Sequence, residues 1–384
     1  MPLFPGTTRK KKLFTRAAIS ASLLIIVAAL VFGCKNDDQG HWMPGTPLSK
    51  EDIVIGILLI DDGSGGWSRA HSMGIAEAQR VLGLRDDQII RKYNVPDVDE
   101  EMSEYMISQS IAEGANIILA TSWGYMDVCE RLAAEHPNVI FVHVSGDKHN
   151  ETNFTNCFGR IYQARYLAGI AAGMKTETGK IGFVAAHGVQ NSEVTSGLNA
   201  FAMGVERVNP DARIYVRVTH SWFYPDGERT AAQALIAEGC DIITQHSDTL
   251  EPLIEAKHSG VWGIGYNVDN RDSLPDTELT SVIWNWGIYY TDLISSIING
   301  SFTTTPFLGG MSDGIVDIAP LNPTLAKPGI EEKLSEIRES IISGEFLVFS
   351  GEYETNDGRI VRISGDQLST TGMDWYYRNV VLLQ

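Results

Sequence analysis

The stretch that decides the fold is IVIGILLIDDGSGGWSRAHSMG, from Ile53 to Gly74. An uninterrupted apolar run ends in two acidic residues and closely spaced glycines, and a helical pattern follows. A nucleotide-binding fold begins with the same order of strand, glycine loop and helix. The G-x-G-x-x-G fingerprint is incomplete here, because Ser68 stands at its third glycine and Trp67 stands where a backbone would approach a pyrophosphate. The loop is therefore predicted to present Trp67 and not to cradle a phosphate.

The same unit recurs about 125 residues later in the chain. AEGANIILATSWG from Ala112 matches AEGCDIITQHSDT from Ala237, and matched apolar runs flank both in the same order. Each copy alternates short apolar runs with helical patterns, which predicts parallel strands buried on both faces. The predicted strands are 53–60, 88–93, 116–121, 139–144, 180–185, 212–218, 241–245 and 261–265, and the predicted helices are 69–83, 101–113, 124–136, 194–208, 227–238 and 250–259. The predicted fold class is α/β, with two doubly wound parallel-sheet lobes.

The N-terminus has the pattern of a secretory signal. Basic residues between Arg9 and Arg16 precede the apolar stretch AAISASLLIIVAALVFG, which is short for a transmembrane helix. VFGC resembles a bacterial lipobox in which Cys34 would be lipidated, and an uncleaved apolar anchor is the alternative. We expect a signal peptide at 1–33, a tether at 34–50, and a body lipid-anchored to the cell membrane that faces the periplasm or the cell exterior.

The net charge and the cysteines indicate which partners and which kinds of site the sequence does not favour. The formal net charge of the 384-residue chain is -18, and it becomes -23 without the five basic residues of the signal. A body this acidic is a poor candidate for binding nucleic acid. Cys129, Cys157 and Cys240 form no close pair in the sequence, so neither a zinc site nor a disulfide framework is indicated. Free buried thiols are favoured, with one bridge left open.

The residues just after the predicted strands are the candidates for a ligand site. Ligands of open parallel sheets bind beyond the carboxyl ends of the strands, and two such lobes facing each other make a cleft. Several tryptophans at these positions favour a planar, polar-edged heterocycle held by stacking, although a sugar would also stack. Nearby acidic side chains disfavour a phosphate. The predicted ligand-binding residues are Trp67, His71, Ser122, Trp123, His187, Glu193, Trp222, Asp248, Asn267, Trp284 and Trp286.

Catalytic and metal motifs are weak in this chain. The sequence has no G-x-x-x-x-G-K-[ST] loop and no H-E-x-x-H pair. No nucleophile and base stand in a recognisable arrangement. We therefore expect a binding protein with no catalytic residues, no metal and no cofactor. A ligand sensor with a membrane signalling partner and a nucleoside hydrolase remain as alternatives.

Several long stretches resemble the basic membrane protein (BMP) family of substrate-binding lipoproteins of ABC transporters. They are ATSWGYMD, FGRIYQARYLAGIAAG, GLNAFAMGVERVNPDA, SWFYPDGERTAAQALIAEGCDIITQHSD, TSVIWNWGIYY, GGMSDGIVDIAPLNP and GMDWYYRNV. The resemblance implies a type I periplasmic-binding-protein fold with a three-strand hinge, a permease as partner, and a ligand enclosed by hinge closure. It implies a first lobe of 51–158 plus about 280–310 and a second lobe of 159–279 plus about 311–384.

The resemblance also implies which aromatic rings hold the ligand. Characterised relatives bind purine nucleosides, and others bind purine bases or riboflavin. Trp67 matches an aromatic residue that stacks on the base, and Ser221-Trp222 resembles the pair that supplies the second stacking ring.

The positions that hold a sugar in these relatives differ here. Asn267 stands at an Asp position, Trp284 at a Lys position, and Ser145 at an acidic position. The resemblance therefore implies a free purine or a similar flat heterocycle in preference to a nucleoside. Glu193 and Asp248 would accept hydrogen bonds from its N–H groups.

Overall fold

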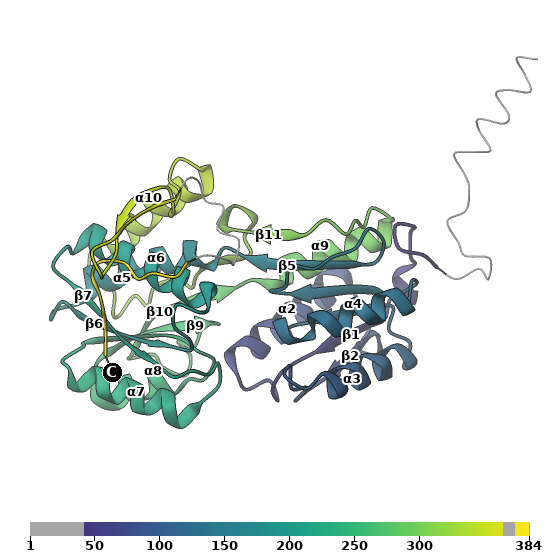
Figure 1. The fold of residues 1–384 in the computed structure, drawn as a ribbon, viewed down its shortest axis with the longest axis horizontal. Helices are drawn as coiled ribbons and strands as arrows, with labels where there is room; N and C mark the ends of the chain where they lie inside the picture. The colour runs from purple at the N-terminus through teal and green to yellow at the C-terminus, as the bar shows by residue number, and fades with distance from the viewer. Residues whose placement is uncertain (1–41, 364–372, 384) are drawn as a thin grey trace, which may run out of the picture.

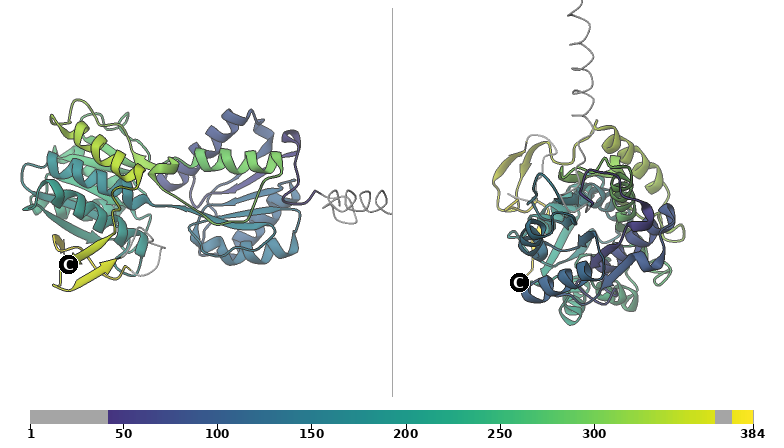
Figure 2. Two further views of the ribbon diagram at one scale, coloured as in Figure 1. Left: turned by 90° about the horizontal axis from the view of Figure 1, so that it is seen from above. Right: turned by 90° about the vertical axis from the view of Figure 1, so that its right-hand side faces the viewer.

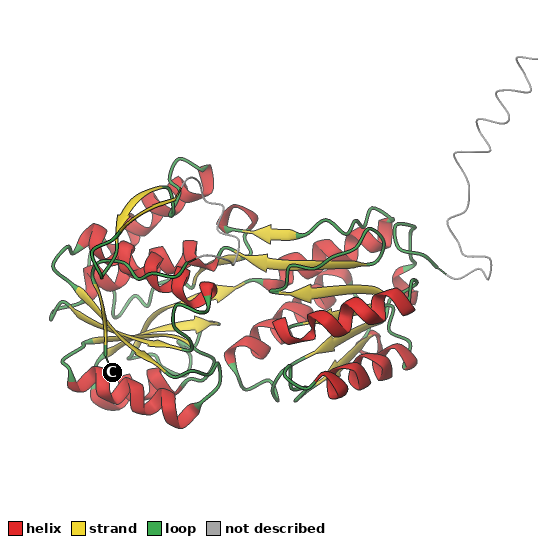
Figure 3. Ribbon diagram, viewed as in Figure 1, coloured by secondary structure: helices red, strands yellow, loops and turns green. Residues whose placement is uncertain are grey.

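The computed structural model describes residues 42–363 and 373–383, and these form two α/β lobes that lie end to end along the longest axis (Figure 1). The predicted signal peptide, Cys34 and the tether as far as residue 41 lie outside the described residues. Among the described residues, no helix is long and apolar enough to cross a membrane. Helices lie on both sides of each main sheet, as Figure 3 shows. The predicted α/β class with two parallel-sheet lobes is therefore confirmed.

The first lobe is built on a six-stranded sheet in the order β11-β5-β4-β3-β1-β2, and all of its pairings are parallel. Every residue of β1, β3, β4 and β5 is buried, as expected of strands covered on both faces. The strands are β1 Ile55–Leu58, β2 Ile89–Lys92, β3 Ile117–Ala120, β4 Ile140–Val144, β5 Phe154–Gly159 and β11 Phe307–Gly309. The helices are η1 Lys50–Asp52, α2 Gly66–Leu82, η2 Asp86–Gln88, α3 Glu100–Ala112, η3 Trp123–Tyr125, α4 Met126–Glu135 and α9 Trp286–Asn299.

The second lobe repeats this plan around a seven-stranded sheet in the order β12-β10-β9-β8-β6-β7-β15, in which only β12 runs antiparallel to its neighbour. Its strands are β6 Lys180–Ala185, β7 Arg213–Val218, β8 Ile242–His246, β9 Trp262–Asn267, β10 Glu278–Trp284, β12 Val316–Ile318 and β15 Val380–Leu382. Its helices are α5 Ile161–Lys175, α6 Ser192–Val208, α7 Pro225–Ala237, α8 Glu251–Ser259, η4 Met311–Asp313 and α10 Ile330–Ser343, and β13 Gly351–Glu354 pairs with β14 Ile360–Ile363 in a separate hairpin.

The lobes are joined by three neighbouring crossings, which follow β5, β10 and β11 (Figure 2, left). The Arg160 N–H donates to the Gly309 carbonyl oxygen over 2.7 Å, and the Asn285 N–H donates to the Ile315 carbonyl oxygen over 2.8 Å. These backbone hydrogen bonds connect the neighbouring crossings. β10 belongs to the second sheet as far as Trp284, so the return to the first lobe comes slightly later than residue 280.

Close helix packing places α5 against α6 in the second lobe. A Cβ at Gly169 would lie 2.1 Å from the Phe201 carbonyl oxygen, and one at Gly204 would lie 2.1 Å from the Tyr166 carbonyl oxygen. Only glycine permits this approach. Helix α6 is capped by Asn191, whose side chain accepts from the Val194 N–H, and this cap fixes the first turn, which contains Glu193.

The three described cysteines, Cys129, Cys157 and Cys240, are free and buried, as the sequence favoured. Burial raises the pKa of each thiol. These thiols are therefore packing groups and poor nucleophiles.

Candidate ligand-binding site

The two lobes touch where α2 begins. The Gly66 N–H in the first lobe donates to the Asp248 carbonyl oxygen in the second over 2.8 Å. One turn further along α2, Arg69 Nη1 donates to Asn270 Oδ1 over 3.4 Å. A Cβ at Gly66 would lie 2.9 Å from Asn267 Nδ2, so the glycine loop comes very close to the end of β9. The structure is therefore in a closed arrangement of the lobes.

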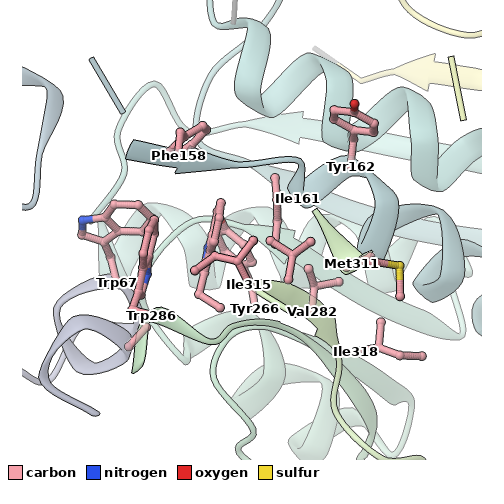
Figure 4. Packing of buried hydrophobic residues seen from close by; sticks show 14 of the residues in the cluster. Trp67, Phe158, Ile161, Tyr162, Tyr266, Val282, Trp286, Met311, Ile315 and Ile318 are labelled. Atoms are coloured by element: carbon pink, nitrogen blue, oxygen red, sulfur yellow. The ribbon is translucent and has the colours of Figure 1, made fainter. Parts of the chain in front are cut away.

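Aromatic side chains pack together at this junction. Trp67 is 9% exposed, and its Nε1 donates to the Thr121 carbonyl oxygen over 2.6 Å. Its ring meets those of Trp284 and Trp286 edge-on, each at 5.8 Å between centroids. Trp284 and Trp286 stack on each other at 4.9 Å with 12° between their planes, across the crossing at Asn285. Figure 4 shows Trp67 and Trp286 side by side, with Phe158 and Tyr266 nearby. This cluster joins the first lobe to the hinge.

His71 lies behind the tryptophans and is fully buried. Its ring stacks on Trp286 at 4.6 Å, and its Nδ1 lies 2.7 Å from the Tyr290 hydroxyl. Burial lowers the pKa of His71 well below its ordinary value, so the imidazole is neutral. His71 Nε2 and Trp286 Nε1 are buried without a hydrogen-bond partner among the described residues.

The second lobe contributes Glu193 together with two rings from strand ends. Glu193 Oε1 lies 3.4 Å from His246 Nε2 and accepts from the Tyr266 hydroxyl over 3.3 Å. Burial raises the pKa of Glu193 to about 7, although Tyr266 and Arg165 act in the opposite direction. Tyr266 in turn accepts from Trp284 Nε1 over 3.4 Å, which links this carboxyl group to the tryptophan cluster.

Trp222 and His187 form the outer part of the same wall. Trp222 is partly buried, and its ring lies 5.1 Å from that of His187 and 5.9 Å from that of His246. Burial lowers the pKa of His187, which keeps this ring neutral near pH 7. Trp222 is thus the less constrained of the two predicted stacking rings.

Asp248 and Asn267 form a buried pair beside the interlobe contact. Asn267 Nδ2 donates to Asp248 Oδ1 over 2.9 Å, whereas Asn267 Oδ1 is buried without a hydrogen-bond partner among the described residues. Asn267 also has a φ of 72°, a left-handed conformation that asparagine tolerates better than most residues. Burial raises the pKa of Asp248 well above its ordinary value, and the charges of Glu228 and Glu193 add to this rise.

Three residues named in the sequence analysis lie at the surface or form their hydrogen bonds within the first lobe. Trp123 is 51% exposed in η3 and remains at the surface. The Ser122 hydroxyl donates to Asp97 Oδ2 over 2.5 Å, within the first lobe. The Ser145 hydroxyl donates to the preceding carbonyl oxygen of Val144 over 2.6 Å.

Sequence reasoning missed some members of the cluster. Tyr266 is the last residue but one of β9 and bridges Glu193 to Trp284, so its place near the end of a predicted strand was a usable signal. Arg165 gave no such signal, because it stands within an apolar helical pattern. It is fully buried, lies 4.2 Å from the centre of the Tyr266 ring, and donates from Nη1 to the Gln245 carbonyl oxygen over 2.8 Å.

Neither a nucleophile elbow nor a metal centre emerges from the described residues. Residues 310–314 read GMSDG and match the G-x-S-x-G pattern, yet they form η4 between two short strands instead of a strand-to-helix turn. The exposed Ser312 hydroxyl donates to Asp313 Oδ2 over 3.3 Å. Within the described ranges, no three His, Cys, Asp or Glu side chains gather to hold a metal ion.

Comparison with known proteins agrees with this architecture. The profile of the Bmp family, described as "ABC transporter substrate-binding protein PnrA-like", matches residues 58–349. A purine-binding protein of Brucella abortus is 32% identical over 89% of this chain and 96% of its own length. A Haloferax volcanii protein named as an ABC transporter glucose-binding protein is 33% identical over 80% of this chain and 76% of its own. The solved structure of an ABC transporter solute-binding protein from Conexibacter woesei superposes with a TM-score of 0.65 at 19% identity, covering 77% of this chain and 97% of that one, and supports the fold. The chain therefore belongs to the Bmp family of ABC transporter substrate-binding proteins.

Proposed function

We propose that this protein captures a purine base or a related flat heterocycle between its two lobes and delivers it to the permease of an ABC importer. It would do so from the extracytoplasmic side, held at the membrane by a lipid on Cys34. A ligand that contacts both lobes favours the closed state, because it gains contacts there that the open state lacks.

The observation that carries this proposal is the aromatic cluster at the lobe junction and the hydrogen-bonding groups beside it. Trp67 lies on the first lobe and Trp222 on the second, so rings are available from both sides of a flat ligand. Stacking on each is worth about 0.5–1.5 kcal/mol beyond the area that is buried. Glu193, which is partly buried, and Asn267, which is buried, would supply oxygen acceptors for ring N–H and amino groups.

The identity of the ligand has to be argued from the residues of this chain, because its relatives are named for different ligands. One at 32% identity is named for purine, one at 33% for glucose, and a Lactococcus lactis protein at 23% for nucleosides. In this chain, the residues at the positions expected to hold a ribose favour binding of a free base over binding of a nucleoside. Asn267 already donates to Asp248, and Trp284 stacks on Trp286 where a lysine would offer a charge.

Calorimetric titration of the protein with adenine, guanine, hypoxanthine, adenosine, riboflavin and glucose tests the proposal. We expect a base to bind more tightly than its nucleoside, and Trp222→Ala to weaken that binding. Tight binding of glucose with no response to any purine or to riboflavin would overturn it. The anchor is tested separately, since Cys34→Ser should move the protein from the membrane to the soluble fraction while leaving the affinity unchanged.

A further inference from the structure

Glu228 is a completely buried carboxylate that joins two separate loops of the second lobe. It stands in the first turn of α7, and its Oε1 accepts from the Tyr224 N–H over 2.9 Å. Its Oε2 accepts from the Ser247 hydroxyl and the Thr249 hydroxyl, each over 2.7 Å, and from the Thr249 N–H over 3.3 Å. All four donors belong to loops that follow the strand ends of β7 and β8.

These two loops carry the second-lobe wall of the candidate site. Trp222 lies in the loop after β7, and Asp248 lies between Ser247 and Thr249 in the loop after β8. The Asp248 N–H donates to the Trp222 carbonyl oxygen over 2.8 Å, so the loops also touch directly. Glu228 therefore bonds to the residues on both sides of Asp248 and to a close neighbour of Trp222.

A glutamate side chain is well suited to joining these two loops. A buried charge is costly unless hydrogen bonds satisfy it, and hydrogen bonds to an ionised acceptor are among the stronger ones. One carboxylate can accept four donors at once, which an amide or a hydroxyl cannot do in the same geometry. The corresponding loops of the first lobe are joined differently, by the bond from the Ser122 hydroxyl to Asp97 Oδ2 and by the bond from the Tyr125 hydroxyl to the Val95 carbonyl oxygen.

We infer that Glu228 is a positioning residue that holds Trp222 and Asp248 in one rigid wall, and that it thereby sets the affinity for the ligand through these two residues. This inference rests on the proposed function of the site. Without Glu228 the two loops would sample arrangements in which ring and carboxylate no longer face the ligand together. Apparent affinity falls in proportion to the fraction of molecules in the competent arrangement.

The test is Glu228→Gln, compared with Glu255→Gln as a matched control. Glutamine keeps the shape, but its NH2 group faces the Tyr224 N–H in one orientation and the Thr249 N–H in the other, and neither N–H can accept from it. Glu255 is also buried in this lobe, on the adjacent helix α8, and its carboxylate accepts from Gln233 Nε2 over 3.1 Å. Hydrogen exchange of the ligand-free protein and calorimetry with adenine and guanine are measured on both variants.

In Glu228→Gln we expect amide exchange at Tyr224 and Thr249 to rise about tenfold and affinity to fall about tenfold. Glu255→Gln should change neither, even where it lowers the melting temperature equally. Unchanged exchange at both amides in a folded Glu228→Gln protein, or faster exchange with full affinity, would overturn the inference. If neither base binds the wild-type protein, the proposed function fails, whereas the exchange data still decide whether Glu228 holds the loops.

Ser247→Ala covers the case in which Glu228→Gln does not fold. It removes one of the four donors and leaves the carboxylate with three, so a smaller effect of the same kind is expected. Exchange at Thr249 should rise, with affinity about threefold weaker. No change in either quantity would count against the inference.

Discussion

The N–H of Gly66 in the first lobe donates to the carbonyl oxygen of Asp248 in the second lobe over 2.8 Å. Both partners are backbone groups, so this bond forms only when the two lobes approach each other closely. Gly66 begins the helix that carries Trp67, and Asp248 lies in the loop held by Glu228. Closure of the lobes therefore sets the distance between the two walls of the site.

Gly66→Ala should favour the open arrangement. The added Cβ would lie 2.9 Å from Asn267 Nδ2 and 3.1 Å from Asn267 Cβ, which the closed state cannot accept without a shift. Alanine is also a better helix former than glycine, so the lobe itself should not be destabilised. We expect about tenfold weaker ligand affinity and a larger radius of gyration by small-angle scattering. Ser64→Ala, at an exposed position of the same loop, is the control, and equal effects in both variants would contradict this explanation.

Trp222, Trp67 and Trp123 should respond differently to substitution by alanine. Trp222→Ala should weaken ligand binding about tenfold at little cost in stability, because its ring is only partly buried. Trp67→Ala should weaken binding and also lower the free energy of unfolding by about 3–5 kcal/mol, since it leaves a cavity in the aromatic cluster. Trp123→Ala should change neither, as its side chain is 51% exposed. Calorimetry and urea unfolding of the three variants separate these outcomes. Unchanged ligand affinity in Trp222→Ala would contradict the proposal that the ligand stacks on this ring.

Ligand affinity should rise with pH through the ionisation of Glu193. Burial raises the pKa of this carboxyl group to about 7, so it loses its proton between pH 6 and 8. An ionised carboxylate accepts hydrogen bonds from ligand N–H groups through both oxygens, whereas the protonated form keeps one as a donor. If binding requires the ionised form, affinity should increase about tenfold from pH 6 to pH 8. Glu193→Gln should flatten this profile, and an equal slope in the variant would assign the dependence to another group.

Stability should fall with rising pH because of Glu278 at the start of β10. Its Oε1 accepts from the Asn270 N–H over 3.2 Å and from the Ser281 hydroxyl, and its Oε2 is buried without a hydrogen-bond partner among the described residues. Burial raises its pKa from 4.5 to about 7. Between these values the folded state holds a proton that the unfolded chain has lost, so the free energy of unfolding decreases as pH rises through that window.

Urea unfolding between pH 4.5 and 8 measures the contribution of Glu278. Glu278→Gln cannot titrate, so its stability should depend less on pH, by about 3 kcal/mol across the range. Glu352→Gln, an exposed change on the β13 hairpin, should leave the slope as it is in the wild type. A slope that is identical in Glu278→Gln and in the wild type would show that Glu278 has the same pKa in both states.

Much of the fold follows from local sequence pattern. The apolar runs at Ile55–Leu58 and Ile117–Ala120 could be recognised as strands buried on both faces, because parallel strands between helix layers have no polar face. The repeat separated the two lobes for the same reason, since each copy contains a complete set of alternating elements. The C-terminal additions could not be predicted in this way. β15 is only three residues long and pairs with β7 from the far end of the chain.

From the residue order alone, the aromatic and acidic side chains that follow the strands could be placed at one edge of each sheet, because the carboxyl ends of parallel strands share that edge. The tertiary structure alone decided which of these residues meet. Trp284 stacks on Trp286 because the chain crosses between lobes at Asn285, and Trp123 remains exposed although it also follows a strand. Glu228 looked like one more acidic residue on a helix, yet it is buried beneath two loops. Periodicity records which face of an element is covered, but contacts between distant loops depend on how the crossings orient the lobes, and no local pattern encodes that orientation.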